Sequence, residues 1–184
     1  MQPVALIALT LFVVVEAAVA DGVAWRIRSI DASVQALLAD GYRRSPTLQR
    51  LAVDVARTDG IVYFQSAHCP VRTLRACLLH TILDAGDFRY LWIRIKPDEP
   101  PDEMVASVAH ELQHALEVLS QKWIRNRWDL LTFYRSAAAG AFGSTPLGSM
   151  FTSYETTAAI EITGKVRSEL AAAAAADGGG DDGQ

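Results

Sequence analysis

The pentapeptide His110-Glu111-Leu112-Gln113-His114 is the segment whose residue types and spacing could do chemistry. Two histidines four residues apart project from one face of a helix, close enough for both imidazoles to bind a single zinc ion. The glutamate that follows the first histidine is then placed to accept a proton from a water molecule held there. The spacing therefore predicts His110 and His114 as metal ligands and Glu111 as a general base.

The residues around this pentapeptide have the periodicity of an amphipathic helix. Apolar side chains recur at positions i, i+3, i+7, i+11 and i+14, namely Val105, Val108, Leu112, Leu116 and Leu119. At about 100° per residue, this stripe lies nearly opposite the two histidines. We expect the stripe to pack on a core and the histidine face to open to a cleft.

A third metal ligand must come from another segment, because a catalytic zinc ion usually takes three protein ligands and a water. No histidine follows His114, so a carboxylate is needed. We favour Glu155, in the expected first turn of a helix whose small residues allow close packing, with Glu161 on the same helix as the alternate. The other candidates are Asp129, Glu117 and Glu169. Glu117 shares the histidine face and suits a hydrogen-bonding partner of a ligand better than a ligand.

On these residues the chain resembles the zincin metallopeptidases, specifically the gluzincin type. In that family a sheet precedes the HExxH helix, and a glutamate on a later helix completes the metal site. The resemblance covers roughly residues 61–170 and is specific at His110, Glu111 and His114. It implies a zinc ion bound by His110, His114 and Glu155, with Glu111 as the base that activates water for peptide hydrolysis.

This chain departs from the sequence patterns of two zincin classes. The metzincin class would need a glycine and a histidine where Glu117 and Ser120 stand, so that class is excluded. Glu155 follows His114 by 41 residues and lacks the N-E-x-x-x-D context of thermolysin-like enzymes. Hydrolysis would also need a group that stabilises an oxyanion. The side chains considered for that role are Tyr134, Tyr154 and His80.

The two ends of the 184-residue chain differ from its middle. Residues 4–15 are a twelve-residue apolar run, followed by Ala18-Val19-Ala20, which predicts a cleaved signal peptide over residues 1–20. The run is shorter than a membrane span of about 20 residues; an uncleaved N-terminal anchor is the alternative. Residues 171–184 are an alanine run and a Gly/Asp segment, which predict a disordered tail, although the alanines can also extend the last helix. Residues 21–170 remain as one domain.

The charge and the cysteine content limit the possible binding partners and the cellular compartment. Four of the 21 acidic residues lie outside residues 21–170, which leaves 17 against 17 basic residues. With no basic stripe and no interleaving of aromatic and basic residues, we expect no nucleic-acid partner. Cys69 and Cys77 are predicted to form a disulfide, with two buried thiols as the alternative. A secreted or periplasmic location follows.

Apolar periodicity predicts an α+β fold. The first helix is expected over residues 27–39, with Gly41 marking its end, and the second runs from Pro46, capped by Ser45, until Asp59-Gly60. Further helices are expected over residues 105–119, 127–138 and 154–170, the last capped by Thr152 or Ser153 after a glycine-rich loop at 140–148. Strands are expected over 61–65, 74–83 and 89–95, the last two in a β-hairpin, and Leu91, Ile93 and Ile95 alternate along the last strand as its apolar face. The expected architecture is zincin-like, with a small, largely antiparallel sheet packed against the HExxH helix and further helices. The expected function is an exported zinc-dependent peptidase of the endopeptidase type, acting on a peptide or protein. The alternative is a non-catalytic zincin-fold protein that binds a partner or peptide in the cell envelope.

Overall fold

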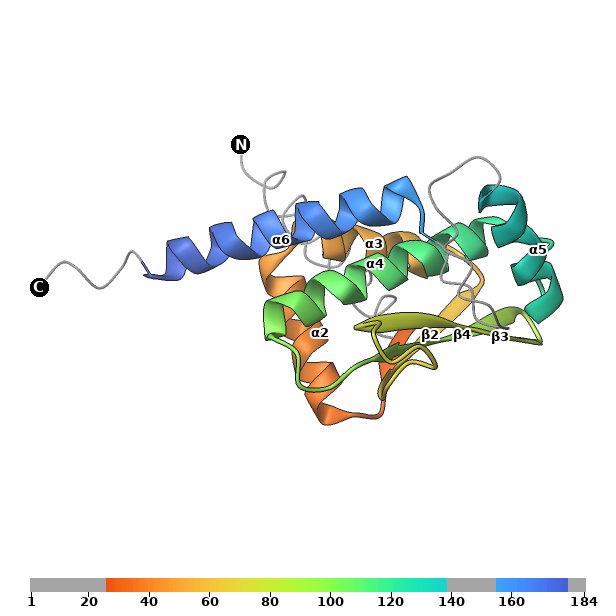
Figure 1. The fold of residues 1–184 in the computed structure, drawn as a ribbon, viewed down its shortest axis with the longest axis horizontal. Helices are drawn as coiled ribbons and strands as arrows, with labels where there is room; N and C mark the ends of the chain where they lie inside the picture. Colours follow the sequence, from red (N-terminus) through yellow and green to blue (C-terminus); the bar gives the residue numbers. More distant parts are fainter. Residues whose placement is uncertain (1–25, 139–154, 179–184) are drawn as a thin grey trace, which may run out of the picture.

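The computed structural model describes residues 26–138 and 155–178, which form an α+β fold (Figure 1). These residues contain a four-stranded sheet and five helices. Their order is β1 (Ile27–Ser29), α2 (Ala32–Arg44), α3 (Pro46–Ala56), β2 (Gly60–Ser66), β3 (Ala76–Ala85), β4 (Phe88–Ile95), α4 (Pro101–Ser120), α5 (Arg127–Ala138) and α6 (Thr157–Gly178).

The sheet is mixed, with the strand order β1-β2-β4-β3. β1 pairs in parallel with β2, β2 in parallel with β4, and β3 antiparallel with β4. The prediction of a largely antiparallel sheet is therefore wrong, for a topological reason. The hairpin puts its second strand, β4, beside β2 and leaves β3 at the edge, so β4 runs in the direction of β2. Helices α2 and α3 form the crossover that a parallel β1–β2 pair requires.

The first predicted helix, residues 27–39, is displaced toward the C-terminus. Residues Ile27–Ser29 pair with β2 instead, and α2 starts only at Ala32. Ile30, which the helical spacing counted as apolar face, is 85% exposed. Pairing with β2 has overridden the local helical pattern. The sequence did not predict β1, because a strand of three residues shows little periodicity.

Gly41 lies inside α2, whereas the sequence predicted that it would mark the end of the helix. A Cβ atom built there would lie 2.8 Å from side-chain atoms of both Leu48 and Val105. Glycine therefore permits α2 to approach α3 and α4 closely. Ser45 then caps α3 as predicted, because its Oγ accepts a hydrogen bond from the N–H of Leu48 at 3.1 Å.

The predicted β-hairpin is confirmed by the antiparallel pairing of β3 and β4, with Gly86 at φ 62° in the turn. The alternation predicted along β4 is also confirmed, because Leu91, Ile93 and Ile95 are buried. Arg89 occupies the same inward face and is fully buried, although its charge gave no hint of that position.

Helix α4 is the central element, because it packs between the sheet and α6 (Figure 1). The predicted apolar stripe is confirmed: Val105, Val108, Leu112 and Leu119 are buried, and Leu116 packs against the core. The opposite face does not open freely, since α6 covers it and the side chain of His114 is only 5% exposed. Both faces of α4 are thus in contact with other elements.

The predictions for the chain ends are tested only in part. The signal peptide over residues 1–20 and the glycine-rich loop at 140–148 lie outside the described residues. At the other end, α6 continues to Gly178, so the alternative that the alanines extend the last helix holds for residues 171–178 and the predicted disordered tail is wrong there. Alanine has the highest helix propensity, which accounts for the extension. In the described residues, no helix has the length and apolar character to cross a membrane.

Candidate metal centre

Three predicted metal-binding side chains converge where α4 meets the start of α6. The Nε2 atoms of His110 and His114 lie 3.2 Å apart, and Glu155 Oε2 lies 3.2 Å from His110 Nε2. All three ligand atoms are within 4.8 Å of one another. The structure thus brings together His110, His114 and Glu155 as a group that could hold a metal ion.

Glu155 occupies a different local position from the one predicted. It lies just before α6, not in its first turn, because Thr156 is the residue that caps the helix. The Oγ1 of Thr156 accepts from the N–H of Ala159 at 3.2 Å, and its carbonyl accepts from the N–H of Ile160 at 3.1 Å. The predicted caps, Thr152 and Ser153, fall outside the described residues.

The ring of His110 is oriented from α6. Its Nδ1 lies 2.9 Å from the Oγ1 of Thr163, whose hydroxyl donates to the carbonyl of Ala159 at 2.8 Å. Because that hydroxyl proton is already used, Thr163 must accept from an Nδ1–H of His110. In the neutral imidazole, the lone pair of His110 therefore lies on Nε2, which faces Glu155 and His114.

The ring of His114 is oriented from its own helix by Glu117. Its Nδ1 lies 3.0 Å from Glu117 Oε2. Burial raises the pKa of Glu117, but hydrogen bonds from His114, Thr156 and Gln113 outweigh this effect and hold it below the usual range. An ionised carboxylate can only accept, so Nδ1 of His114 carries a proton, and in the neutral imidazole Nε2 then offers the lone pair that a metal ion needs. The sequence-based view of Glu117 as a partner of a ligand agrees with this contact.

The group fits a tetrahedral zinc ion in both spacing and donor chemistry. Ligand atoms about 2.0 Å from zinc in tetrahedral geometry lie roughly 3.3 Å apart, and two of the separations here are 3.2 Å. Two lone pairs and a carboxylate oxygen facing one another repel unless a cation or a proton lies between them. Burial lowers the pKa of His110, but Glu155 and Glu111 outweigh it and raise the pKa overall, as expected where positive charge is favoured.

The carboxyl of Glu111 reaches the edge strand β3. Its Oε2 accepts a hydrogen bond from the N–H of Leu78 at 2.6 Å. Burial raises its pKa, and the opposing influence of His114, His110 and this hydrogen bond does not cancel that rise. A raised pKa brings a carboxylate closer to the working range of a general base at neutral pH.

Tyr134 of α5 lies beside the histidines. Its ring centroid is 6.1 Å from that of His114 and 6.4 Å from that of His80 on β3. Burial raises the pKa of Tyr134 well above its usual value, and the charges of Glu117, Glu111 and Glu155 add to the rise. The phenol therefore stays neutral and able to donate across the physiological pH range. Tyr154, the third residue considered as a stabiliser of an oxyanion, is outside the described residues.

The remaining candidate carboxylates lie apart from the group. Glu161 is exposed on α6. Asp129 accepts from the N–H of Arg125 and the side chain of Asn126 at the start of α5. Glu169 accepts from Ser45 and Thr47 and holds α6 against the N-terminus of α3.

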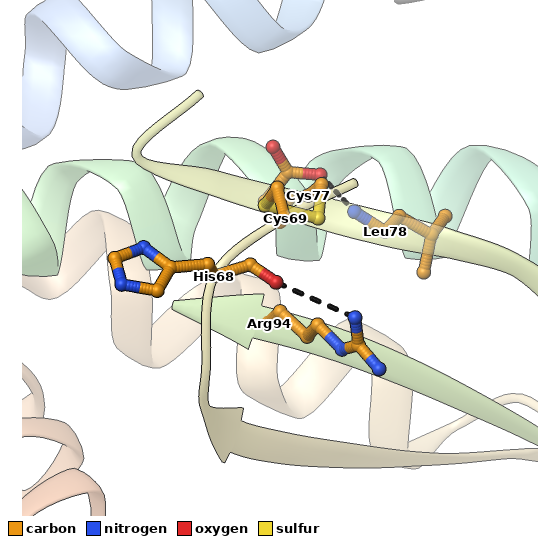
Figure 2. The surroundings of a disulfide bond; sticks show 6 residues. His68, Cys69, Cys77, Leu78 and Arg94 are labelled. Atoms are coloured by element: carbon orange, nitrogen blue, oxygen red, sulfur yellow. Dashed lines mark hydrogen bonds between the residues drawn. A yellow bond between two sulfur atoms is a disulfide. The ribbon is translucent and has the colours of Figure 1, made fainter. Parts of the chain in front are cut away.

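The predicted disulfide is present and lies close to the site. Cys69 and Cys77 are bonded, and no free cysteine occurs in the chain (Figure 2). Cys77 precedes Leu78, the residue whose N–H binds Glu111. The disulfide therefore ties a loop to the part of β3 that contacts the predicted base.

Sequence reasoning missed the contributions of α6. Thr156, Ala159, Thr163, Val166 and Leu170 recur at i, i+3, i+7, i+10 and i+14, which is one helical stripe. Ala159, Val166 and Leu170 are buried. The two threonines occupy the first and the middle positions of this stripe, and polar residues in an otherwise apolar stripe are the signal that could have identified them.

Comparisons with known protein families, curated proteins and solved structures give no match to this chain. The site must therefore be interpreted from its own geometry.

Proposed function

We propose that this protein is a zinc-dependent peptidase that acts outside the cytoplasm. The observation that carries the proposal is the convergence of two Nε2 lone pairs and a carboxylate, from His110, His114 and Glu155, beside the raised-pKa carboxyl of Glu111. Imidazole and carboxylate ligands of this number are typical of a catalytic zinc site. The disulfide and the lack of a membrane-crossing helix in the described residues are compatible with an extracellular location.

Glu111 supplies the base in this proposal. A bound zinc ion would polarise the scissile carbonyl and lower the pKa of a nearby water. Glu111 uses Oε2 to accept from Leu78, and Oε1 has no hydrogen-bond donor among the described residues. Oε1 can accept a proton from water and return it to the leaving amine.

Tyr134 is the side chain that best suits the oxyanion. Its phenol is neutral and its ring lies beside His114, and the charges of three nearby carboxylates disfavour loss of the phenol proton. A neutral donor in a water-poor site stabilises developing negative charge strongly. His80 packs beside Tyr134 and has its pKa lowered by burial and by Arg127, so it is the weaker donor.

The position of β3 supports a peptide as the substrate class. β3 is at the edge of the sheet and pairs with β4 on one side among the described strands. An extended peptide can bind an edge strand through main-chain hydrogen bonds. Because Leu78 on β3 contacts Glu111, such a peptide would lie near the base.

The test combines metal analysis with hydrolysis. Purified protein should carry about one zinc ion per chain and cleave casein or a peptide library. A chelator should abolish cleavage and zinc should restore it. Glu111→Gln keeps the shape and removes the base, so it should retain zinc while cleavage falls by about 10²–10⁴-fold. His110→Ala should lose the zinc.

Glu161→Gln is the matched control, because it makes the same change on an exposed carboxylate of α6 that lies apart from the site. It should retain both zinc and cleavage. A wild-type protein that binds zinc but cleaves none of these substrates would favour the partner-binding alternative. Zinc retained in full by His110→Ala would contradict the metal site itself.

A further inference from the structure

The side chain of Glu155 has few restraints of its own. It is 39% exposed, and its carboxylate contacts Nε2 of His110 at 3.2 Å. A half-exposed glutamate loses considerable rotamer freedom when it is held in one position. The placement of its carboxylate at the metal centre therefore depends on how firmly the adjoining backbone is held.

The next residue, Thr156, holds that backbone at three points. Its hydroxyl accepts from the N–H of Ala159 and its carbonyl accepts from the N–H of Ile160, which fixes it to α6. The same hydroxyl donates to Glu117 Oε1 at 2.8 Å, which fixes it to α4. One side chain thus caps α6 and joins it to the helix that carries both histidines.

Glu117 links this contact to a second metal ligand. While Oε1 accepts from Thr156, Oε2 accepts from His114 Nδ1 at 3.0 Å. A continuous path of hydrogen bonds therefore runs from the residue beside Glu155 to the imidazole of His114. Partners that orient ligands in this way typically change metal affinity by 10–100-fold when they are lost.

We propose that Thr156 is a positioning residue for the metal centre, which sets the backbone of Glu155 and, through Glu117, the orientation of His114. This inference rests on the metal site of the proposed function, but it does not depend on peptide hydrolysis. Binding of the ion and docking of the α6 N-terminus on α4 are then a single coupled process. Metal binding should stabilise the cap of α6, and loss of the cap contact should weaken metal binding.

Two substitutions at Thr156 test the proposal by zinc affinity, measured in competition with a chromophoric chelator. Thr156→Val keeps the branched shape and removes the hydroxyl, so zinc affinity should fall by about 10-fold or more. Thr156→Ser keeps a hydroxyl that can both donate and accept, so affinity should stay within about threefold of wild type. Equal affinities for Thr156→Val and wild type would overturn the proposal.

Thr58→Val is the matched control. Like that of Thr156, the hydroxyl of Thr58 donates one hydrogen bond and accepts another. It donates to the carbonyl of Val55 and accepts from the N–H of Gly60, and neither partner belongs to the metal centre. This variant should bind zinc like wild type. A comparable loss of affinity in Thr58→Val would show a general effect of destabilisation and would overturn the positioning role.

Hydrogen exchange of the Ala159 amide gives a readout that needs no activity. Zinc should slow this exchange in wild type and in Thr156→Ser, and much less in Thr156→Val. If the protein binds zinc but hydrolyses nothing, the peptidase proposal fails and the role of Thr156 is still decided by affinity and exchange. If zinc leaves the Ala159 amide unchanged in wild type, the coupling is refuted.

Discussion

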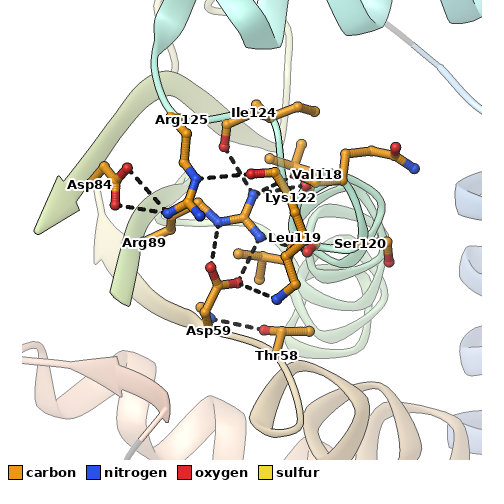
Figure 3. Close-up of polar contacts among 12 residues, drawn as sticks. Thr58, Asp59, Asp84, Arg89, Val118, Leu119, Ser120, Lys122, Ile124 and Arg125 are labelled. Atoms are coloured by element: carbon orange, nitrogen blue, oxygen red, sulfur yellow. Dashed lines mark hydrogen bonds and ion pairs between the residues drawn. The ribbon is translucent and has the colours of Figure 1, made fainter. Parts of the chain in front are cut away.

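Arg89 offers the strongest test of how α4 is held in place. Its guanidinium is fully buried and forms a two-pronged ion pair with Asp59, at 2.7 and 3.0 Å (Figure 3). It also donates to carbonyl groups at and just beyond the C-terminus of α4. These belong to Val118, Leu119, Gln121 and Ile124. Helix C-termini leave such carbonyls without intrahelical partners, and Arg89 satisfies several at once.

Arg89→Met should destabilise the metal-free protein by about 3–5 kcal/mol. The substitution fills similar space but leaves Asp59, whose side chain is only 17% exposed, without its buried cation. It also removes the donor to the four carbonyls. For a chain of this size each kcal/mol lowers Tm by about 2–4 °C, so a fall of roughly 6–20 °C is expected.

Urea unfolding in the presence of a chelator measures this loss without a contribution from metal. Arg94→Met is the control, because Arg94 lies on the same strand but on its opposite face, and should cost less than about 1 kcal/mol. In a double-mutant cycle, Asp59→Asn should cost clearly less in the Arg89→Met background than in wild type. Additive costs, or a loss below about 1 kcal/mol for Arg89→Met, would refute the reasoning.

Three further outcomes are expected. Glu155→Ala should lower zinc affinity at least about 10-fold while Glu161→Ala leaves it unchanged, as measured by chelator competition; the opposite pattern would move the third ligand to Glu161. Replacing Cys69 and Cys77 by serine should lower the free energy of unfolding by about 2–3 kcal/mol, and unchanged urea midpoints would contradict this. Burial raises the pKa of Glu169, but the hydrogen bonds from Ser45 and Thr47 outweigh burial, and the pKa is lowered overall. The ionised carboxylate therefore stabilises the fold above its unfolded-state pKa, and this contribution is lost as the pH falls through the folded-state pKa. Glu169→Gln should accordingly reduce the dependence of the free energy of unfolding on pH in the acid range.

The features that sequence predicted well are those encoded by neighbouring residues. Ser45 followed by Pro46 marks the start of α3, and the turn before β4 joins a hairpin. The HExxH helix follows from a stripe of apolar residues spaced along one segment. In each case the information lies within one continuous segment of chain, where periodicity and turn chemistry act directly.

The features that sequence did not predict depend on distant partners. The parallel pairing of β2 with β4 depends on which strand of the hairpin lies inside. Arg89 sits at an inward position of β4 that alternation could identify, but only the carbonyls of α4 make a buried guanidinium favourable there. The sequence predicted Glu155 as the third metal ligand. Its position before α6, however, depends on the contact between Thr156 and Glu117, which are 39 residues apart.

The adjacent residues His110 and Glu111 show why α4 must be covered on two sides. Successive side chains on a helix point about 100° apart, so a metal ligand and its neighbouring base cannot both be oriented from one surface. Here α6 orients His110 through Thr163, and β3 holds Glu111 through the N–H of Leu78. Metal affinity should therefore respond mainly to changes in α6, and the pKa of the base mainly to changes in β3. The two requirements of the proposed chemistry are met by separate parts of the fold, with α4 as the element they share.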